Sequence, residues 1–143
     1  ILMARSGMVT LVYDPMGQGG GCSFDKKDHR LAMWSMHIGK PLLGQRVEDV
    51  LTSASYLKSS PKVGSDAVRI VGIGQAGPVV LHSAVLDGKF ASVTLRDSIQ
   101  SWIEDVVARP KDLGAISHVV PSALRKYALP QLAALLENRL TVE

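Results

Sequence analysis

The segment Gly72-Ile73-Gly74-Gln75-Ala76-Gly77 has the residue types and spacing that most clearly suggest chemistry. It fits the pattern G-x-G-x-x-G, in which glycines let a pyrophosphate approach the backbone N–H groups of a helix N-terminus. Such a site also needs an acidic residue about 20 positions further on, which binds the ribose. Asp97 lies at that spacing, so dinucleotide binding is one hypothesis for this segment.

The same six residues also align with G-x-S-x-G, the nucleophile elbow. That sharp strand-to-helix turn needs small residues on both sides so that a serine can project above the sheet. The serine position is Gly74, which has no side chain to attack an acyl carbon. A third interpretation is a glycine-rich connection without chemistry, and the turn by itself leaves all three open.

Other candidate side chains follow the next predicted strand. Asp97 and Ser98 stand at its carboxyl end, where sites in α/β proteins gather, and Asp97 is the candidate site acid. His82 falls on the helix after the glycine turn, where we expect it to be packed or solvated. His118 lies in an irregular region of the kind that often covers such sites.

A metal site is not expected. His29 and His37, with Asp25 and Asp28, come nearest to a ligand set, but their spacing matches no known pattern. Cys22 is the only cysteine, which rules out an internal disulfide and a cysteine metal cluster. We expect it to be an unreactive thiol, because no nearby histidine has an orienting partner. The sequence therefore predicts neither a metal nor a cofactor.

Hydrophobic patterns predict the elements that position these residues. Short β-branched runs indicate buried strands, and apolar residues at offsets of three, four and seven indicate a helix with one buried stripe. The predicted strands are 9–13, 68–71 and 91–95, with another beginning near 139, and the predicted helices are 43–57, 78–87, 102–107 and 132–136. Irregular chain is expected from 17 to about 39. In the first helix, Arg46 and Asp49 are expected to face solvent.

The alternation of strands and helices predicts an α/β fold, a parallel sheet with helices on both faces. Residues 1–143 contain no repeat or linker, so a single domain is expected. The chain opens like the last turn of a helix and closes like the start of a strand. We therefore expect it to be the central part of a larger domain.

Composition narrows the classes of partner. The 143 residues are 46% hydrophobic and 20% charged, a mixture that indicates a globular chain rather than a disordered one. No apolar run reaches the roughly 18 residues of a membrane span. The formal charge of +3 is scattered along the chain, which argues against a nucleic-acid partner. Homo-oligomer formation and cellular location stay open.

Two linked segments resemble carbohydrate esterase family seven, which contains the acetyl xylan esterases and cephalosporin C deacetylases of the α/β-hydrolase fold. Residues 12–20 resemble the family's Asp-x-Arg-Gly-Gln-Gly segment, and Gly72–Gly77 resembles its Gly-x-Ser-Gln-Gly-Gly elbow. The helix between them, the approach Ser60-Pro61-Lys62-Val63 and the stretch 81–87 are similar in the same order. The resemblance covers residues 1 to about 98, beyond which related bacterial esterase-like hydrolases match equally well.

The resemblance implies a partial α/β-hydrolase fold and hydrolysis of a small ester or an acylated carbohydrate. It implies that Gly74 replaces the nucleophilic serine and that the backbone N–H of Gln75 belongs to an oxyanion hole. Met16 replaces the loop arginine, whereas Gly17 and Gln18 are retained. The family's catalytic aspartate and histidine lie further along the fold, and this chain ends before them.

The expectation is therefore a hydrolase-like protein that is inactive as it stands, so its status as an enzyme stays open. One alternative is a non-catalytic binding module that keeps the pocket of a hydrolase. The other is dinucleotide binding at Gly72–Gly77.

Overall fold

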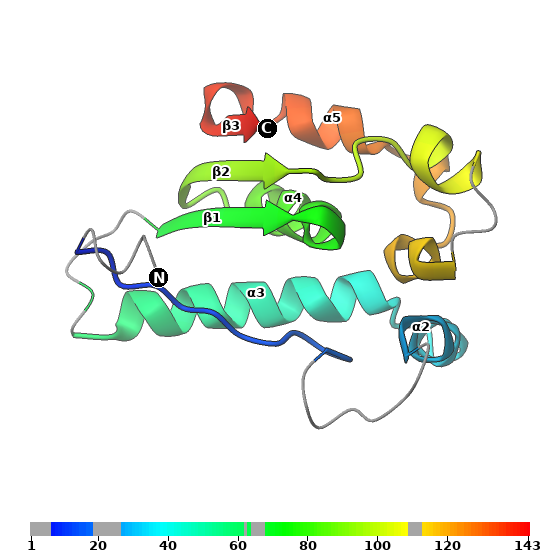
Figure 1. Cartoon of the computed structure of the whole chain (residues 1–143), viewed down its shortest axis with the longest axis horizontal. Helices are drawn as coiled ribbons and strands as arrows, with labels where there is room; N and C mark the ends of the chain where they lie inside the picture. Colours follow the sequence, from blue (N-terminus) through cyan, green and yellow to red (C-terminus); the bar gives the residue numbers. More distant parts are fainter. Residues whose placement is uncertain (1–6, 19–26, 62, 64–67, 109–112) are drawn as a thin grey trace.

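The computed structural model describes residues 7–18, 27–61, 63, 68–108 and 113–143. Its helices and strands are, in chain order, α2 (Lys27–His37), α3 (Leu42–Ser59), β1 (Val68–Ile73), α4 (Gly77–Leu86), β2 (Phe90–Arg96), α5 (Leu129–Ala134) and β3 (Leu140–Val142). Short 3-10 turns are η1 (Gly74–Ala76), η3 (Leu113–His118), η4 (Ala123–Arg125) and η5 (Glu137–Arg139), and η2 (Trp102–Val107) is a π-helix. Figure 1 shows β1 and β2 between α3 and α5.

The three strands form one parallel sheet in the order β1-β2-β3. Ile70 pairs with Val93 across the first ladder, and Leu95 pairs with Val142 across the second. Parallel neighbours need crossover connections, and these contain α4 and then α5. The predicted α/β class with a parallel sheet is confirmed at this level, including the strand at the end of the chain.

Helices cover only one face of the sheet in the part of the chain that the structure describes. In β1, Val68, Ile70 and Gly72 point inward, whereas Val71 and Ile73 are 38% and 60% exposed. Helix α4 packs against β1 and β2, and α3 packs against α4. Figure 1 shows α4 behind these strands. The prediction of helices on both faces is therefore wrong for the described residues.

The predicted strand at 9–13 is also wrong. These residues form no ladder, and Val12 is 88% exposed. Figure 1 shows the segment running alongside α3 rather than entering the sheet. β-Branched composition favours extended chain, but a strand forms only when its backbone groups find a partner edge.

Two further boundaries differ from the sequence prediction. The stretch expected to be irregular contains α2, with Ala32 and Ser35 buried. The last helix begins at Leu129 rather than Leu132, because Pro130 suits its first turn, and it ends at Ala134.

Among helices in the described ranges, none is long and apolar enough to cross a membrane.

The hydrophobic core lies between the covered face of the sheet and helices α3, α4 and α5. The stripe predicted for the 43–57 helix is confirmed, since Leu43, Val47, Val50 and Ala54 of α3 are all buried. The remaining core residues are Val79, Val80, Leu81, Ala84, Phe90, Val93, Leu95, Trp102, Ala123, Leu129, Leu132 and Leu136. Most of α4 is packed into this core, directly after the glycine turn.

Candidate functional site at the carboxyl edge of the sheet

The turn between β1 and α4 is built from three glycines with different roles. Gly74 has a φ of +57°, and a Cβ added to it would meet nothing within 4 Å. A Cβ on Gly72 would lie 3.0 Å from Cγ2 of Val80. A Cβ on Gly77 would lie 2.5 Å from Cβ of Ser98. Packing therefore requires Gly77 and leaves little room at Gly72, whereas Gly74 is favoured by its backbone conformation and faces open space.

The start of α4 has fewer free backbone donors than an average helix. Pro78 lies in its first turn and has no N–H, and the N–H of Gly77 donates to the carbonyl of Gly74. Gln75 is exposed, so its side chain is not part of a buried site. The turn therefore offers few backbone donors to a large anion.

The structure brings the end of β2 next to this turn, as the sequence predicts for a carboxyl edge. Ile73 pairs with Arg96, so Gly74 and Asp97 leave neighbouring strands at the same edge. Asp97 is exposed, has a φ of +49°, and donates its backbone N–H to the carbonyl of Glu143 over 3.1 Å.

Ser98 lies against Gly77 and donates its hydroxyl to the carbonyl of Ile99 over 3.3 Å. Arg96 forms an ion pair with the Glu143 carboxylate, and its Nε lies 2.8 Å from Oε2. This pair ties β2 to the segment that follows β3. The carboxyl edge is thus held together by contacts between residues of neighbouring strands.

His82 is not available as a base for this edge. The ring is 9% exposed, Nδ1 lies 2.6 Å from the Pro78 carbonyl, and Nε2 lies 3.0 Å from the Tyr127 hydroxyl. Burial lowers the pKa of His82, and the Pro78 contact partly opposes this. The sequence left open whether His82 is packed or solvated, and the structure shows it packed. His118 is completely buried, and His29 and His37 are exposed.

Among the residues that the structure describes, no group of three or more His, Cys, Asp or Glu side chains could hold a metal ion. Cys22, Asp25 and the side chain of Asp28 lie outside what the structure describes.

The loop around Met16 is anchored by α3. The Met16 N–H donates to Oδ2 of Asp49 over 2.8 Å, and Nε of Arg46 donates to the Met16 carbonyl over 2.9 Å. Arg46 is 2% exposed, so the expectation that it faces solvent is wrong. Gly17 is buried with a φ of +80°, and an added Cβ would clash with Leu31.

An open hollow of about 410 Å³ lies beside this anchored loop. Its lining residues are Tyr13, Asp14, Pro15, Met16, Gly17, Gln18, Asp49, Thr52 and Ser53. Burial raises the pKa of Tyr13, and the nearby Asp49 carboxylate adds to that increase. The i, i+3 spacing of Arg46 and Asp49 places both side chains on one flank of the helix, but that spacing carries no signal that a loop would bury Arg46.

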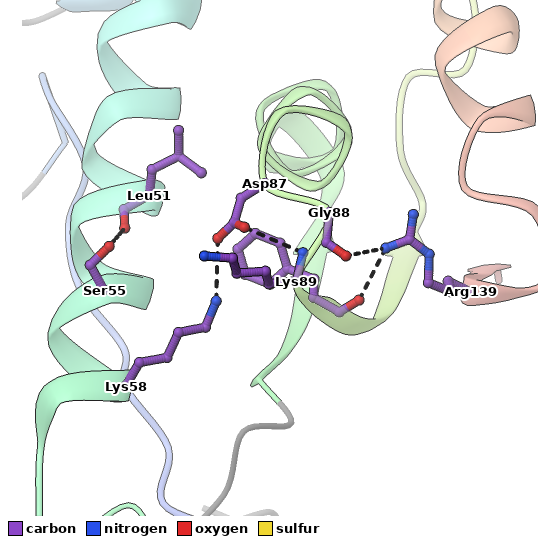
Figure 2. A network of polar contacts seen from close by, with 8 residues as sticks. Leu51, Ser55, Lys58, Asp87, Gly88, Lys89 and Arg139 are labelled. Carbon is purple, nitrogen blue, oxygen red and sulfur yellow. Dashed lines mark hydrogen bonds and ion pairs between the residues drawn. The ribbon is translucent and has the colours of Figure 1, made fainter.

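A second polar network stabilises the opposite edge of the sheet (Figure 2). Lys58 on α3 pairs with Asp87 over 3.3 Å, and Asp87 accepts the backbone N–H of Lys89. Arg139 donates to the Gly88 carbonyl over 2.9 Å and to the Phe90 carbonyl over 3.3 Å. These contacts surround the turn that leads into β2, far along the strand from Asp97. They position β2 and carry no candidate chemistry.

The fold and this edge define the class of the protein: an α/β protein with a parallel sheet and a glycine-rich strand-to-helix turn. Comparison with protein-family models, curated proteins and solved structures finds no match for this chain.

Proposed function

We propose that this chain is an α/β-hydrolase-like protein, resembling the acetyl xylan esterases, in which Gly74 occupies the position of the nucleophile. Its ligand class is a small ester or an acylated carbohydrate. The observation that carries the proposal is the conformation of Gly74, with a φ of +57° and open space around an added Cβ. An elbow needs a strained residue at the apex that faces outward, between close-packed small neighbours.

The flanking glycines support the same proposal. Gly72 allows α4 to approach β1 closely, and Gly77 allows α4 to approach Ser98 so closely that no larger residue fits without a shift. The backbone N–H of Gln75, next to the apex, is the donor that an oxyanion hole would use.

The residues of the edge favour binding without turnover. Gly74 has no hydroxyl to form an acyl intermediate, and both ring nitrogens of His82 are engaged. Asp97 is exposed and its backbone is tied to Glu143. The chain would therefore hold an ester near Gln75 and leave its acyl bond intact.

We predict that the purified chain hydrolyses p-nitrophenyl acetate no faster than buffer does. Acyl transfer through a serine needs an activated hydroxyl, and the apex of this turn has none. An acetylated xylo-oligosaccharide should shift the backbone amide signals of Gly74 and Gln75 in an NMR titration, and the deacetylated sugar should not. Saturable hydrolysis that an organophosphonate blocks would contradict the missing-nucleophile proposal. Shifts confined to other residues would contradict the site.

Dinucleotide binding is the second candidate, and one observation favours it. Asp97 directly follows β2, the neighbour of β1, which is where a ribose-binding acid would stand. The missing N–H of Pro78 weakens it, because a pyrophosphate at this turn would lose one donor.

Calorimetry with NAD separates the two candidates. We predict no measurable heat of binding at concentrations up to about 1 mM, which corresponds to a binding free energy weaker than about 4 kcal/mol. Micromolar binding that Gly74→Ala and Asp97→Ala both weaken would replace the hydrolase-like proposal with a dinucleotide site. Asp105→Ala provides the control of an aspartate away from this turn, since Asp105 is half-buried and accepts backbone N–H groups from Gln100 and Ser101.

A further inference from the structure

Three aromatic side chains from distant parts of the chain meet on α4. His82 belongs to α4, Trp102 to η2, and Tyr127 to the segment before α5. The ring centroids lie 5.7 Å apart for His82 and Trp102, 5.6 Å for His82 and Tyr127, and 5.5 Å for Trp102 and Tyr127. We call these three residues the aromatic cluster.

Hydrogen bonding fixes the tautomer of His82. The Pro78 carbonyl can only accept, so the nitrogen 2.6 Å away, Nδ1, carries the proton. Nε2 then has a lone pair and accepts the proton of the Tyr127 hydroxyl over 3.0 Å. The cluster is therefore built around a neutral imidazole.

We propose that the aromatic cluster is an acid-sensitive contact, in which proton uptake by His82 loosens Tyr127 and Trp102 from α4. A protonated ring has an N–H at Nε2, so it can no longer accept from Tyr127. The hydroxyl must turn its own proton away and find another acceptor. The charge would also be placed in a ring that is more than nine-tenths buried.

Packing and ring contacts, rather than a hydrogen bond of its side chain, hold Trp102 in the cluster. It is 5% exposed, and among the described residues its Nε1 has no hydrogen-bond partner. Ring contacts and packing therefore hold η2 in place. By contrast, α5 should stay attached, because Leu129, Leu132 and Leu136 are buried in the core.

Charged groups on the neighbouring elements are engaged elsewhere or exposed. The engaged groups are Lys58 of α3, which pairs with Asp87, Arg46 of α3, which binds the Met16 carbonyl, and Arg96 of β2, which pairs with Glu143. Asp105 of η2 accepts backbone N–H groups. The exposed groups are Arg69 of β1, Glu104 of η2, and Arg125 and Lys126 beside Tyr127. Helix α5 and η1 contain no titratable side chain, and η3 carries the buried His118. Burial is the main cause of the lowered pKa of His82.

The direction of the pH effect follows from that shift. The folded state binds the proton less readily than the unfolded state, whose histidine has the ordinary pKa of 6.5. The contribution of neutral His82 to stability is complete above pH 6.5. This contribution decreases as the pH falls from 6.5 toward the lower pKa of His82 in the folded state, and it is lost below that pKa.

Fluorescence of Trp102 tests the proposal in a Trp34→Phe background, where Trp102 is the only tryptophan. We predict an emission change on acidification with a midpoint below pH 6.5, while far-UV circular dichroism stays constant. His82→Gln should abolish the change, and His37→Gln, at an exposed position, should leave it intact. Tyr127→Phe should move the midpoint upward toward 6.5, because the hydroxyl no longer favours the neutral ring.

Imidazole NMR of the unchanged chain gives a test that needs no variant to fold. His82 should show the Nδ1–H tautomer and titrate below 6.5. Titration at or above 6.5, or an Nε2–H tautomer, would overturn the proposal. So would an emission change that persists in His82→Gln, and its loss in His118→Gln would assign the effect to that residue instead.

Discussion

Gly77→Ala is expected to destabilise the fold by about 3 kcal/mol, the range of a residue forced into a space already filled. The new Cβ would lie 2.5 Å from Cβ of Ser98, an atom fixed to the backbone after β2. A side-chain rotation cannot relieve that contact, so either α4 or the end of β2 must move. Urea unfolding followed by far-UV circular dichroism measures the loss.

The companion variants separate crowding from backbone strain. Gly74→Ala adds a Cβ where nothing lies within 4 Å, so it should cost only about 1 kcal/mol from its positive φ. Combining Gly77→Ala with Ser98→Gly should recover most of the lost stability, because only the Cα of residue 98 then remains, at 3.7 Å. Additive effects of the two changes would show that Ser98 does not pack on Gly77.

Phe90→Ala is expected to lower stability by about 4 kcal/mol, as removal of a buried aromatic side chain typically does. Phe90 begins β2, is 2% exposed and belongs to the core cluster. Nζ of Lys58 lies 5.6 Å from its ring centroid, so a cation–π contact is lost together with the packing. The network of Figure 2 surrounds the same strand end, with Arg139 donating to the Phe90 carbonyl over 3.3 Å.

Tyr56→Ala is the matched control for this truncation. Tyr56 is also aromatic, but it is 65% exposed on α3, and alanine suits a helix. Its replacement should change the free energy of unfolding by no more than about 0.5 kcal/mol. Equal losses for Phe90→Ala and Tyr56→Ala would contradict the position of the core.

Much of the candidate site could be predicted because its signals are local. The run Val68-Arg69-Ile70-Val71 followed by glycines and Pro78 indicates a strand, a turn and a helix through backbone preferences alone. The structure places β1, Gly74 and α4 in that order. Asp97 reaches the same edge because parallel strands end together, which the alternation of elements already implies.

The failed predictions concern positions whose environment depends on distant residues. The 9–13 segment has the composition of a strand, but it lies along α3 with Val12 exposed. Arg46 looks like a solvent-facing residue of an amphipathic helix, yet the Met16 carbonyl holds it in a buried position. Periodicity describes a helix face and cannot show which loop will cover it.

By itself, the sequence determined the α/β class, the parallel order of strand, helix and strand, and a glycine turn without a serine at its apex. These features follow from residue propensities over a few neighbouring positions. Only the tertiary structure decided that the helices cover one face of the described sheet, that Ser98 excludes any side chain at Gly77, and that His82 accepts from Tyr127, 45 residues away. Such contacts depend on how the core closes, because packing and hydrogen-bond geometry select partners that no local pattern encodes.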